Sequence, residues 1–216
     1  MRRYVQFLKF YLPLTYPNII WGKMDKNAKT VLDVGCGDGS FMALLNKDKK
    51  FEVTGIDAYK SYLAKAKKTG VYKKLILGDV RGLLFKEDSF DIVLCSQVIE
   101  HLKKKEGERL INNLGKIARS QVIIATTVGF FPYEPFEGKD DNPLQVHKSG
   151  WQPEEFEKRG YKVYGQGAGF VYGRKRIVRP LPQLLQIPFF GLSYCLSPLF
   201  YFFPKHAAHM ICVKNL

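Results

Sequence analysis

The stretch that decides the fold is Val31-Leu32-Asp33-Val34-Gly35-Cys36-Gly37-Asp38-Gly39. Its first half is a short aliphatic run, which is typical of a buried strand. Its second half places glycine at every other position, so the backbone can turn tightly and a ligand can approach without meeting a Cβ atom. The residues that follow, from Ser40 to Asn46, are apolar at helical spacing. The stretch therefore predicts a strand, a glycine turn and a helix, with a ligand site at the turn.

Strand-like and helix-like segments alternate along residues 29–130. The strands expected after the glycine turn are 51–57, 74–77, 90–95 and 121–126, and the expected helices are 59–68 and 104–119. This alternation predicts an α/β fold, a doubly wound and mostly parallel sheet with helices on both faces. Ligands of such sheets bind at the carboxyl ends of the strands.

Three carboxylates, those of Asp33, Asp57 and Asp79, follow the ends of consecutive predicted strands. Along one rim they would accept hydrogen bonds from an ammonium group, a ribose diol and an adenine amine, and they would repel a pyrophosphate. The glycine spacing is G-x-G-x-G, whereas a nicotinamide site requires G-x-G-x-x-G, and no P-loop lysine follows. S-adenosylmethionine is therefore favoured over NAD. Taken singly, Asp57 could instead cap a helix and Asp79 could be a turn residue.

With these pieces in order, the chain resembles a class I S-adenosylmethionine-dependent methyltransferase of the type 11 group, which includes ubiquinone/menaquinone-type methyltransferases. The stretches that carry the resemblance are 31–39, 55–57, 78–79 and 89–102. The resemblance spans residues 29–130 and implies a Rossmann-like fold, with S-adenosylmethionine as cofactor and S-adenosylhomocysteine as product.

The same resemblance assigns parts of the cofactor to particular residues. It implies that Asp33 and the glycine turn hold the methionine end, that Asp57 accepts the ribose hydroxyls, and that Asp79 binds the adenine amine. The cofactor-binding residues it implies are Asp33, Gly35, Cys36, Gly37, Gly39, Asp57, Ala58, Asp79, Val80, Ser96 and Gln97.

Methyl transfer from a sulfonium is an in-line displacement, so the protein mainly positions the acceptor and excludes water. If the acceptor must lose a proton, the candidate catalytic bases are His101 and His147. Each has a structural alternative, because His101 follows Glu100 at an expected helix start and His147 could tie down a loop. The aromatic stretch 127–136 is a candidate wall of the acceptor site, or else a loop packed on the core.

The cysteines predict neither a disulfide framework nor a metal site. Cys36, Cys95, Cys195 and Cys212 are scattered, with no C-x-x-C pair and no spacing suited to zinc. We therefore expect reduced thiols in a cytoplasmic protein. Residues 4–12 have helical spacing, and because polar residues interrupt this apolar stretch and no small-residue cleavage site follows, it is not a convincing export signal.

The formal net charge is +14, and it is unevenly distributed. After Glu157 the chain has nine Lys and Arg residues and no Asp or Glu in its last 59 positions. This asymmetry suggests an anionic partner, either a membrane surface or nucleic acid, although a solvated basic face would have the same composition.

Four regions are expected along the chain. They are an N-terminal helical segment (1–28), the cofactor-binding core (29–171), a basic and hydrophobic insert (172–208) and a final antiparallel strand (209–216). Residues 187–203 carry no charge, but Pro188, Gly191 and Pro198 argue against one straight membrane-spanning helix. The insert could be a lid over the active site, a contact with the membrane interface, or a dimer interface.

The sequence thus predicts an enzyme that transfers a methyl group from S-adenosylmethionine to a small, lipophilic acceptor, with peripheral membrane association as a compatible property. One alternative is methylation of RNA or protein, which the positive charge favours. The sequence has no Asn-Pro-Pro-Tyr-type motif and no recognisable RNA-binding appendage, so nucleic acid is the less favoured partner. The other alternative is a non-catalytic protein that binds S-adenosylmethionine.

Overall fold

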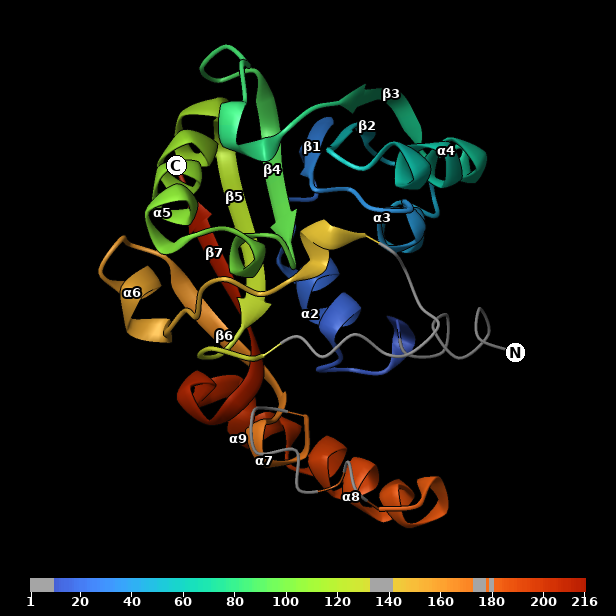
Figure 1. Cartoon of the computed structure of the whole chain (residues 1–216), viewed down its shortest axis with the longest axis vertical. Coiled ribbons are helices and arrows are strands. Elements are labelled where there is room, and N and C mark those ends of the chain that lie inside the picture. Colours follow the sequence, from blue (N-terminus) through green and yellow to red (C-terminus); the bar gives the residue numbers. More distant parts are fainter. Residues whose placement is uncertain (1–9, 133–141, 173–177, 179–180) are drawn as a thin grey trace.

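The structure is a computed structural model that describes residues 10–132, 142–172, 178 and 181–216. Its centre is one seven-stranded sheet with strand order β3-β2-β1-β4-β5-β7-β6 (Figure 1). The strands are β1 Thr30–Val34, β2 Glu52–Asp57, β3 Tyr72–Leu77, β4 Phe90–Ser96, β5 Ala118–Thr127, β6 Lys162–Ala168 and β7 Ala207–Asn215. β7 is antiparallel to both β5 and β6, whereas the pairs among β1 to β5 are parallel. The predicted fold class is confirmed.

Helices cover both faces of this sheet (Figure 1). The longer helical elements are α2 Tyr16–Lys23, α3 Ser40–Leu45, α4 Lys60–Thr69, α5 Lys104–Ile117, α6 Pro153–Glu157, α7 Gly169–Tyr172, α8 Gln183–Cys195 and α9 Ser197–Phe202. Single 3-10 turns are η1 Val80–Gly82, η2 Ile99–His101, η3 Pro143–Gln145 and η4 Pro204–His206.

Alternation along β1 shows how the two faces are filled. Val31 and Leu32 are neighbours and both fully buried, but they belong to different clusters, because successive side chains of a strand point to opposite faces. Leu32 packs in the cluster that contains α5 and α6, and Val31 in the one that contains α2 and α3. The sheet is therefore buried on both sides, as expected of parallel strands.

The predicted end of the helix that begins at residue 104 is wrong. We expected the helix from residue 104 to continue to 119, but α5 ends at Ile117 and β5 begins at Ala118. Ala118 pairs with Phe90 of β4, so strand pairing overrides the helical propensity of these residues. Most of the helix expected at 4–12 lies outside the described residues.

The insert forms an arm that leaves the sheet at its β6–β7 end (Figure 1). α8 continues through Pro188 and Gly191, although a proline removes one helical hydrogen bond. The break falls at Leu196, and Pro198 lies in the first turn of α9, where proline is tolerated. None of the helices in the described part of the chain is long and apolar enough to cross a bilayer.

Candidate functional site

The glycine turn after β1 has the conformation that its sequence predicts. Gly35 has φ +71°, and its N–H and that of Cys36 donate to the carbonyl of Ile56 at 2.8 and 3.0 Å. A Cβ at Gly35 would lie 2.3 Å from a methyl group of Val98. Gly39, with φ +75°, is the N-cap of α3. Both positions require a residue without a side chain.

Asp57 ends β2 beside this turn. Its carboxylate accepts the N–H of Gly37 at 2.9 Å and the N–H of Tyr59 at 2.8 Å. The side chain thus fixes both the glycine turn and the chain entering α4, and it also lines a cleft along the carboxyl ends of β1, β2 and β4. Asp57 is not the N-cap of α4, which is Tyr59, but it does hold the residues that lead into this helix.

Asp79, after β3, lines the same cleft but is already paired. It caps η1 by accepting the N–H of Arg81 at 2.8 Å, and the Arg81 guanidinium lies 2.5 Å from a carboxylate oxygen. Hydrogen bonds from Arg81 hold the pKa of Asp79 below its usual range. An adenine amine at this position would therefore compete with Arg81.

Asp33 is not among the residues that line the cleft, whereas Asp57 and Asp79 are. It is 5% exposed, and the Tyr72 hydroxyl donates to it at 2.7 Å. Burial raises the pKa of this carboxyl to about 7. The Tyr72 ring reaches Asp33 by packing against Gly39 and Gly55, where added Cβ atoms would lie 2.8 Å from the ring. Asp33 thus holds the Tyr72 ring against the glycine turn through this hydrogen bond.

The cleft, here called the cofactor pocket, holds about 130 Å³ of free space. The predicted residues that line it are Gly35, Gly37, Asp57, Ala58, Asp79, Val80 and Gln97, together with His101. The predicted residues Asp33, Cys36, Gly39 and Ser96 are not among its lining. Its free space is below the roughly 300–1,000 Å³ of typical ligand pockets, so a bound nucleoside would require some side chains to move.

Part of the lining could not be anticipated from the sequence. These residues are Tyr62, Arg81, Val98, Leu102, Glu106, Asn142, Leu144, Gln145 and Lys148. The segment 142–148 is brought over the pocket because the N–H groups of Lys148 and Ser149 donate to the carbonyl of Glu100 at 2.7 and 3.1 Å. No motif marks such a backbone contact.

The two candidate bases, His101 and His147, lie together, with ring centroids 4.8 Å apart. Burial, with a smaller effect of His147, lowers the pKa of His101 to about 4. Glu100 beside them is fully buried, and burial raises the pKa of its carboxyl to about 7. A neutral imidazole with so low a pKa is a weak proton acceptor at neutral pH.

A second cavity, here called the chamber, adjoins the first and has a volume of about 520 Å³. Its walls come from the segment before and at the start of α2, from β6 and β7, and from the arm. They include Leu12, Tyr16, Pro17, Gln166, Phe190, Tyr194, Ser197 and His209. The described part of the aromatic stretch 127–136 contributes nothing to this lining, and residues 133–136 lie outside the described residues.

One hydrogen bond joins the two cavities. Gln97, in the cofactor pocket, donates its side-chain amide to the hydroxyl of Tyr16, in the chamber, at 3.1 Å. Gln97 has φ +56°, an uncommon conformation for a residue other than glycine, and its N–H donates to the Ala125 carbonyl at 2.7 Å. The turn after β4 therefore places the side-chain amide of Gln97 between the two cavities.

Comparison with known proteins agrees with this geometry. Residues 31–121 match a family described as a methyltransferase domain. This match supports the methyltransferase family that the sequence resembles. The predictions of the family and of S-adenosylmethionine as cofactor are confirmed.

Individual relatives share about a third or less of their residues with the aligned part of this chain. An uncharacterised protein of Methanocaldococcus jannaschii is 28% identical over 70% of this chain and 63% of its own length. The 2-methyl-6-phytyl-1,4-hydroquinone methyltransferase of a Synechocystis strain is 32% identical over 46% of this chain and 33% of its own. The chain thus spans less than two thirds of the length of either relative.

A solved structure of an S-adenosylmethionine-dependent methyltransferase from Archaeoglobus fulgidus shares the fold over nearly the whole chain. It covers 99% of this chain and 94% of its own, with a TM-score of 0.59 and 17% identity. The likeness therefore extends beyond the matched domain to β6, β7 and the arm, at the level of fold.

Proposed function

We propose that this protein transfers the methyl group of S-adenosylmethionine, held in the cofactor pocket, to a small lipophilic acceptor held in the chamber. The observation that carries the proposal is the Gln97–Tyr16 hydrogen bond between the two cavities. The chamber volume, about 520 Å³, suits a drug-sized or larger ring compound. The hydroquinone acceptor named for the Synechocystis relative makes alkylated quinols the first class to test.

In the pocket, the Asp57 carboxylate is positioned to accept the ribose hydroxyls, and the glycine turn leaves room for the methionine portion. The sulfonium methyl would then face the Ser96–Gln97 turn, next to Tyr16. Burial raises the pKa of the Tyr16 phenol, so this group stays protonated and can donate a hydrogen bond to an acceptor oxygen. The protein's contribution is alignment and exclusion of water.

The test is release of S-adenosylhomocysteine with three acceptor classes: an alkylated hydroquinone in mixed micelles, total RNA, and a denatured protein mixture. We expect turnover with the quinol only. Phe190→Ala and Tyr194→Ala, which remove rings from the chamber wall, should raise KM for the quinol and leave cofactor affinity unchanged. Leu84→Ala is the matched control, because this apolar side chain is 97% exposed and lies outside both cavities and the arm. Turnover with RNA or protein instead would overturn the choice of acceptor, and cofactor binding without turnover in any class would favour a non-catalytic protein.

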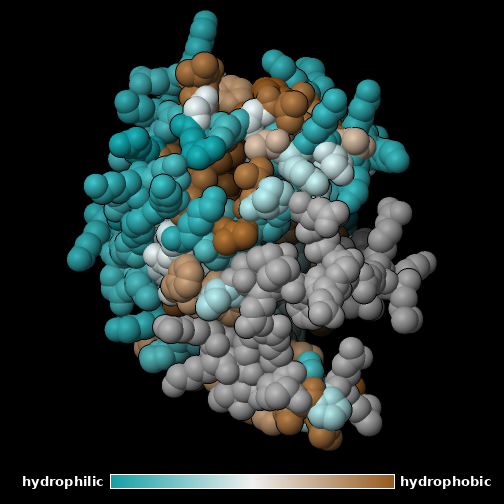
Figure 2. Space-filling model, in the orientation of Figure 1, coloured by the Kyte–Doolittle hydropathy of each residue, from teal (hydrophilic) through white to brown (hydrophobic). Residues whose placement is uncertain are grey.

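We also propose that the arm contacts a membrane from which the acceptor enters the chamber. Exposed apolar side chains cover it, at Leu185, Ile187, Phe190, Leu192, Leu199, Phe202 and Phe203. Figure 2 shows apolar surface at the lower end of the molecule, where the arm lies, against a mostly hydrophilic surface over α5 and α6. The neighbouring sequence 174–179 is rich in arginine and lysine, which favours anionic headgroups.

Flotation with vesicles tests this arm contact. Wild-type protein should bind vesicles containing phosphatidylglycerol more strongly than neutral vesicles. The variant Leu185→Gln/Ile187→Gln/Leu192→Gln should lose that binding, because these exposed residues lie outside the chamber lining. Unchanged flotation of the variant would contradict membrane contact, and a dimer of the wild type that the same variant dissociates would favour the alternative of a subunit interface.

A further inference from the structure

Three potential metal ligands meet beside the cofactor pocket. One ligand atom from each of Glu100, His101 and His147 lies within 4.8 Å of the other two. A first-row divalent ion with bonds of about 2.1 Å holds tetrahedral ligand atoms about 3.4 Å apart. Side-chain rotations that move these ligand atoms by about 1 Å would therefore bring all three within bonding distance of one ion. Two imidazoles and one carboxylate are a donor set suited to such ions.

The carboxylate of Glu100 supplies an independent observation. Glu100 is fully buried, and one of its oxygens accepts the Thr126 hydroxyl at 2.8 Å. The other oxygen, Oε1, is buried without a hydrogen-bond partner in the described part of the chain. Leaving such an acceptor unsatisfied costs about 1–3 kcal/mol, and more for a charged group. A cation is a chemically fitting partner for it.

The two histidines are held in place by the backbone. The Lys148 and Ser149 N–H groups bond to the Glu100 carbonyl, and the Ser149 hydroxyl donates to the Ile99 carbonyl at 3.1 Å. These contacts fasten the segment that carries His147 to η2, which carries His101. Hydrogen bonds also link the His101 ring to the backbone of 145–146, while its Nδ1 is buried without a partner in the described chain. Metal-binding histidines characteristically bond through their second nitrogen in this way.

We propose that Glu100, His101 and His147 bind one divalent transition-metal ion at the edge of the cofactor pocket. Three protein ligands would leave coordination positions open for water or substrate, and one of the three, His101, is part of the lining of the cofactor pocket. A role for the ion in orienting an acceptor oxygen rests on the proposed function, whereas binding of the ion does not.

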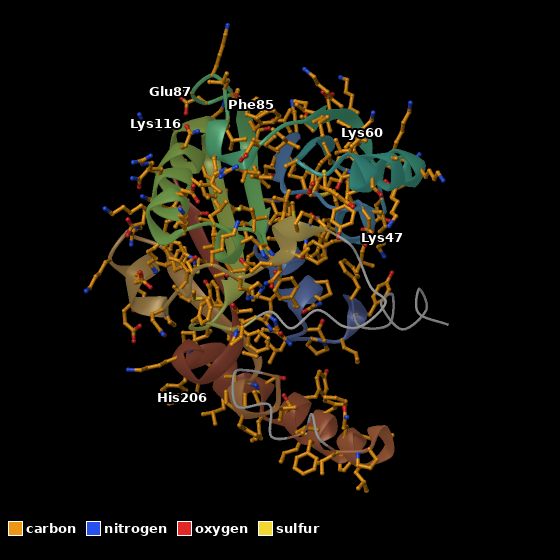
Figure 3. All side chains as sticks on the ribbon, viewed as in Figure 1. Lys47, Lys60, Phe85, Glu87, Lys116 and His206 are labelled. Carbon is orange, nitrogen blue, oxygen red and sulfur yellow. The ribbon has the colours of Figure 1, made fainter. Side chains whose placement is uncertain are left out.

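The experiment uses untagged full-length protein freed of metal by a chelator, with Co²⁺ as the probe. Titration should show one saturable site per chain, a visible d–d absorption band, and displacement by Zn²⁺. Glu100→Gln and His147→Asn should each weaken Co²⁺ affinity by at least about 10-fold. His206→Asn is the matched control, because this exposed histidine lies on η4 at the base of the arm, as Figure 3 shows.

Thermal unfolding separates loss of the site from loss of the fold. Co²⁺ should raise the Tm of the wild type and of His206→Asn, and leave that of His147→Asn unchanged. Absence of saturable binding, or equal affinity in the wild type and both site variants, would overturn the proposal and leave a hydrogen-bonded cluster. S-adenosylhomocysteine affinity, measured on the same samples, reports on the proposed function separately.

Discussion

The Tyr16 hydroxyl lies 2.7 Å from the Ser96 hydroxyl, although the two residues are 80 positions apart. Tyr16 begins α2, which precedes the sheet, and Ser96 ends β4, next to Gln97 of the cofactor pocket. The Tyr16 ring also packs edge-on against His209 of β7, with centroids 5.7 Å apart. The Tyr16 side chain thereby forms part of the wall between the cofactor pocket and the chamber.

Tyr16→Phe tests this role of the side chain. Removing the hydroxyl deletes the bonds to Ser96 and Gln97, and we expect the free energy of unfolding to fall by about 1–2 kcal/mol. Turnover should fall with little change in cofactor affinity, because the phenol faces the chamber. Urea unfolding and calorimetry measure the two effects. Tyr59→Phe is the control, because this half-buried tyrosine lies outside both cavities. Equal stability of the Tyr16 variant and the wild type would contradict the hydrogen bonds of the Tyr16 hydroxyl to Ser96 and Gln97.

Gly35→Ala and Gly37→Ala form a second, matched pair. Both glycines have positive φ, but a Cβ at Gly35 would also strike Val98, whereas one at Gly37 meets no protein atom within 4 Å. We expect the Gly35 variant to lose more stability, by about 1–3 kcal/mol, because strain and overlap add. Gly37→Ala should mainly lower the affinity for the cofactor, since the added methyl group enters the cofactor pocket. Thermal unfolding and calorimetry distinguish them, and equal losses of stability would contradict the geometry.

Arg81→Ala tests the competition at Asp79. The ion pair is exposed, so it contributes no more than about 1 kcal/mol. If the adenine amine replaces Arg81 on the Asp79 carboxylate, its removal should tighten S-adenosylhomocysteine binding by up to about 5-fold, and Asp79→Asn should weaken it. Calorimetry measures both. Weaker binding by Arg81→Ala would instead mean that this guanidinium contacts the cofactor.

Asp33 predicts a specific dependence of stability on pH. Its folded pKa of about 7 is above the value of about 3.9 in an unfolded chain, so the folded state binds the extra proton between these values. The contribution of this carboxyl to the free energy of unfolding is therefore fully present below pH 4. It decreases as the pH rises to 7, by up to roughly 4 kcal/mol.

Asp33→Asn should remove that decrease. The difference in unfolding free energy between variant and wild type should become more favourable to the variant from pH 5 to pH 8, as measured by urea unfolding. Asp48→Asn, at an exposed position, is the matched control. A pH-independent difference for the Asp33 variant would show that the carboxyl is not held protonated.

Much of the sheet was predictable because its signals are local. β1 contains the aliphatic run that predicts it, and the positions of Gly35 and Gly39 follow from the backbone that they must adopt. Asp57 likewise lies where its distance from the glycine turn suggests. These features depend on neighbours a few residues away, which a sequence displays directly.

The remaining features depend on distant partners. Asp33 is buried because the Tyr72 ring fits against two glycines, which no spacing shows. The 142–148 segment covers the pocket through backbone bonds to Glu100, more than 40 residues earlier in the chain. His101 and His147 were singled out separately as bases, and only the fold shows that they adjoin each other and Glu100.

Calorimetric titration with S-adenosylhomocysteine, comparing wild type with Asp57→Ala, tests the cofactor pocket most directly. The wild type should bind one molecule per chain, and the variant should bind more weakly by about 1–3 kcal/mol, because a charged acceptor facing the ribose is lost. Asp38→Ala, on an exposed side chain of the same turn outside the pocket, should bind as the wild type does, and thermal unfolding should show both variants folded. Equal affinity of the Asp57 variant and wild type, or no binding by the wild type, would contradict the account.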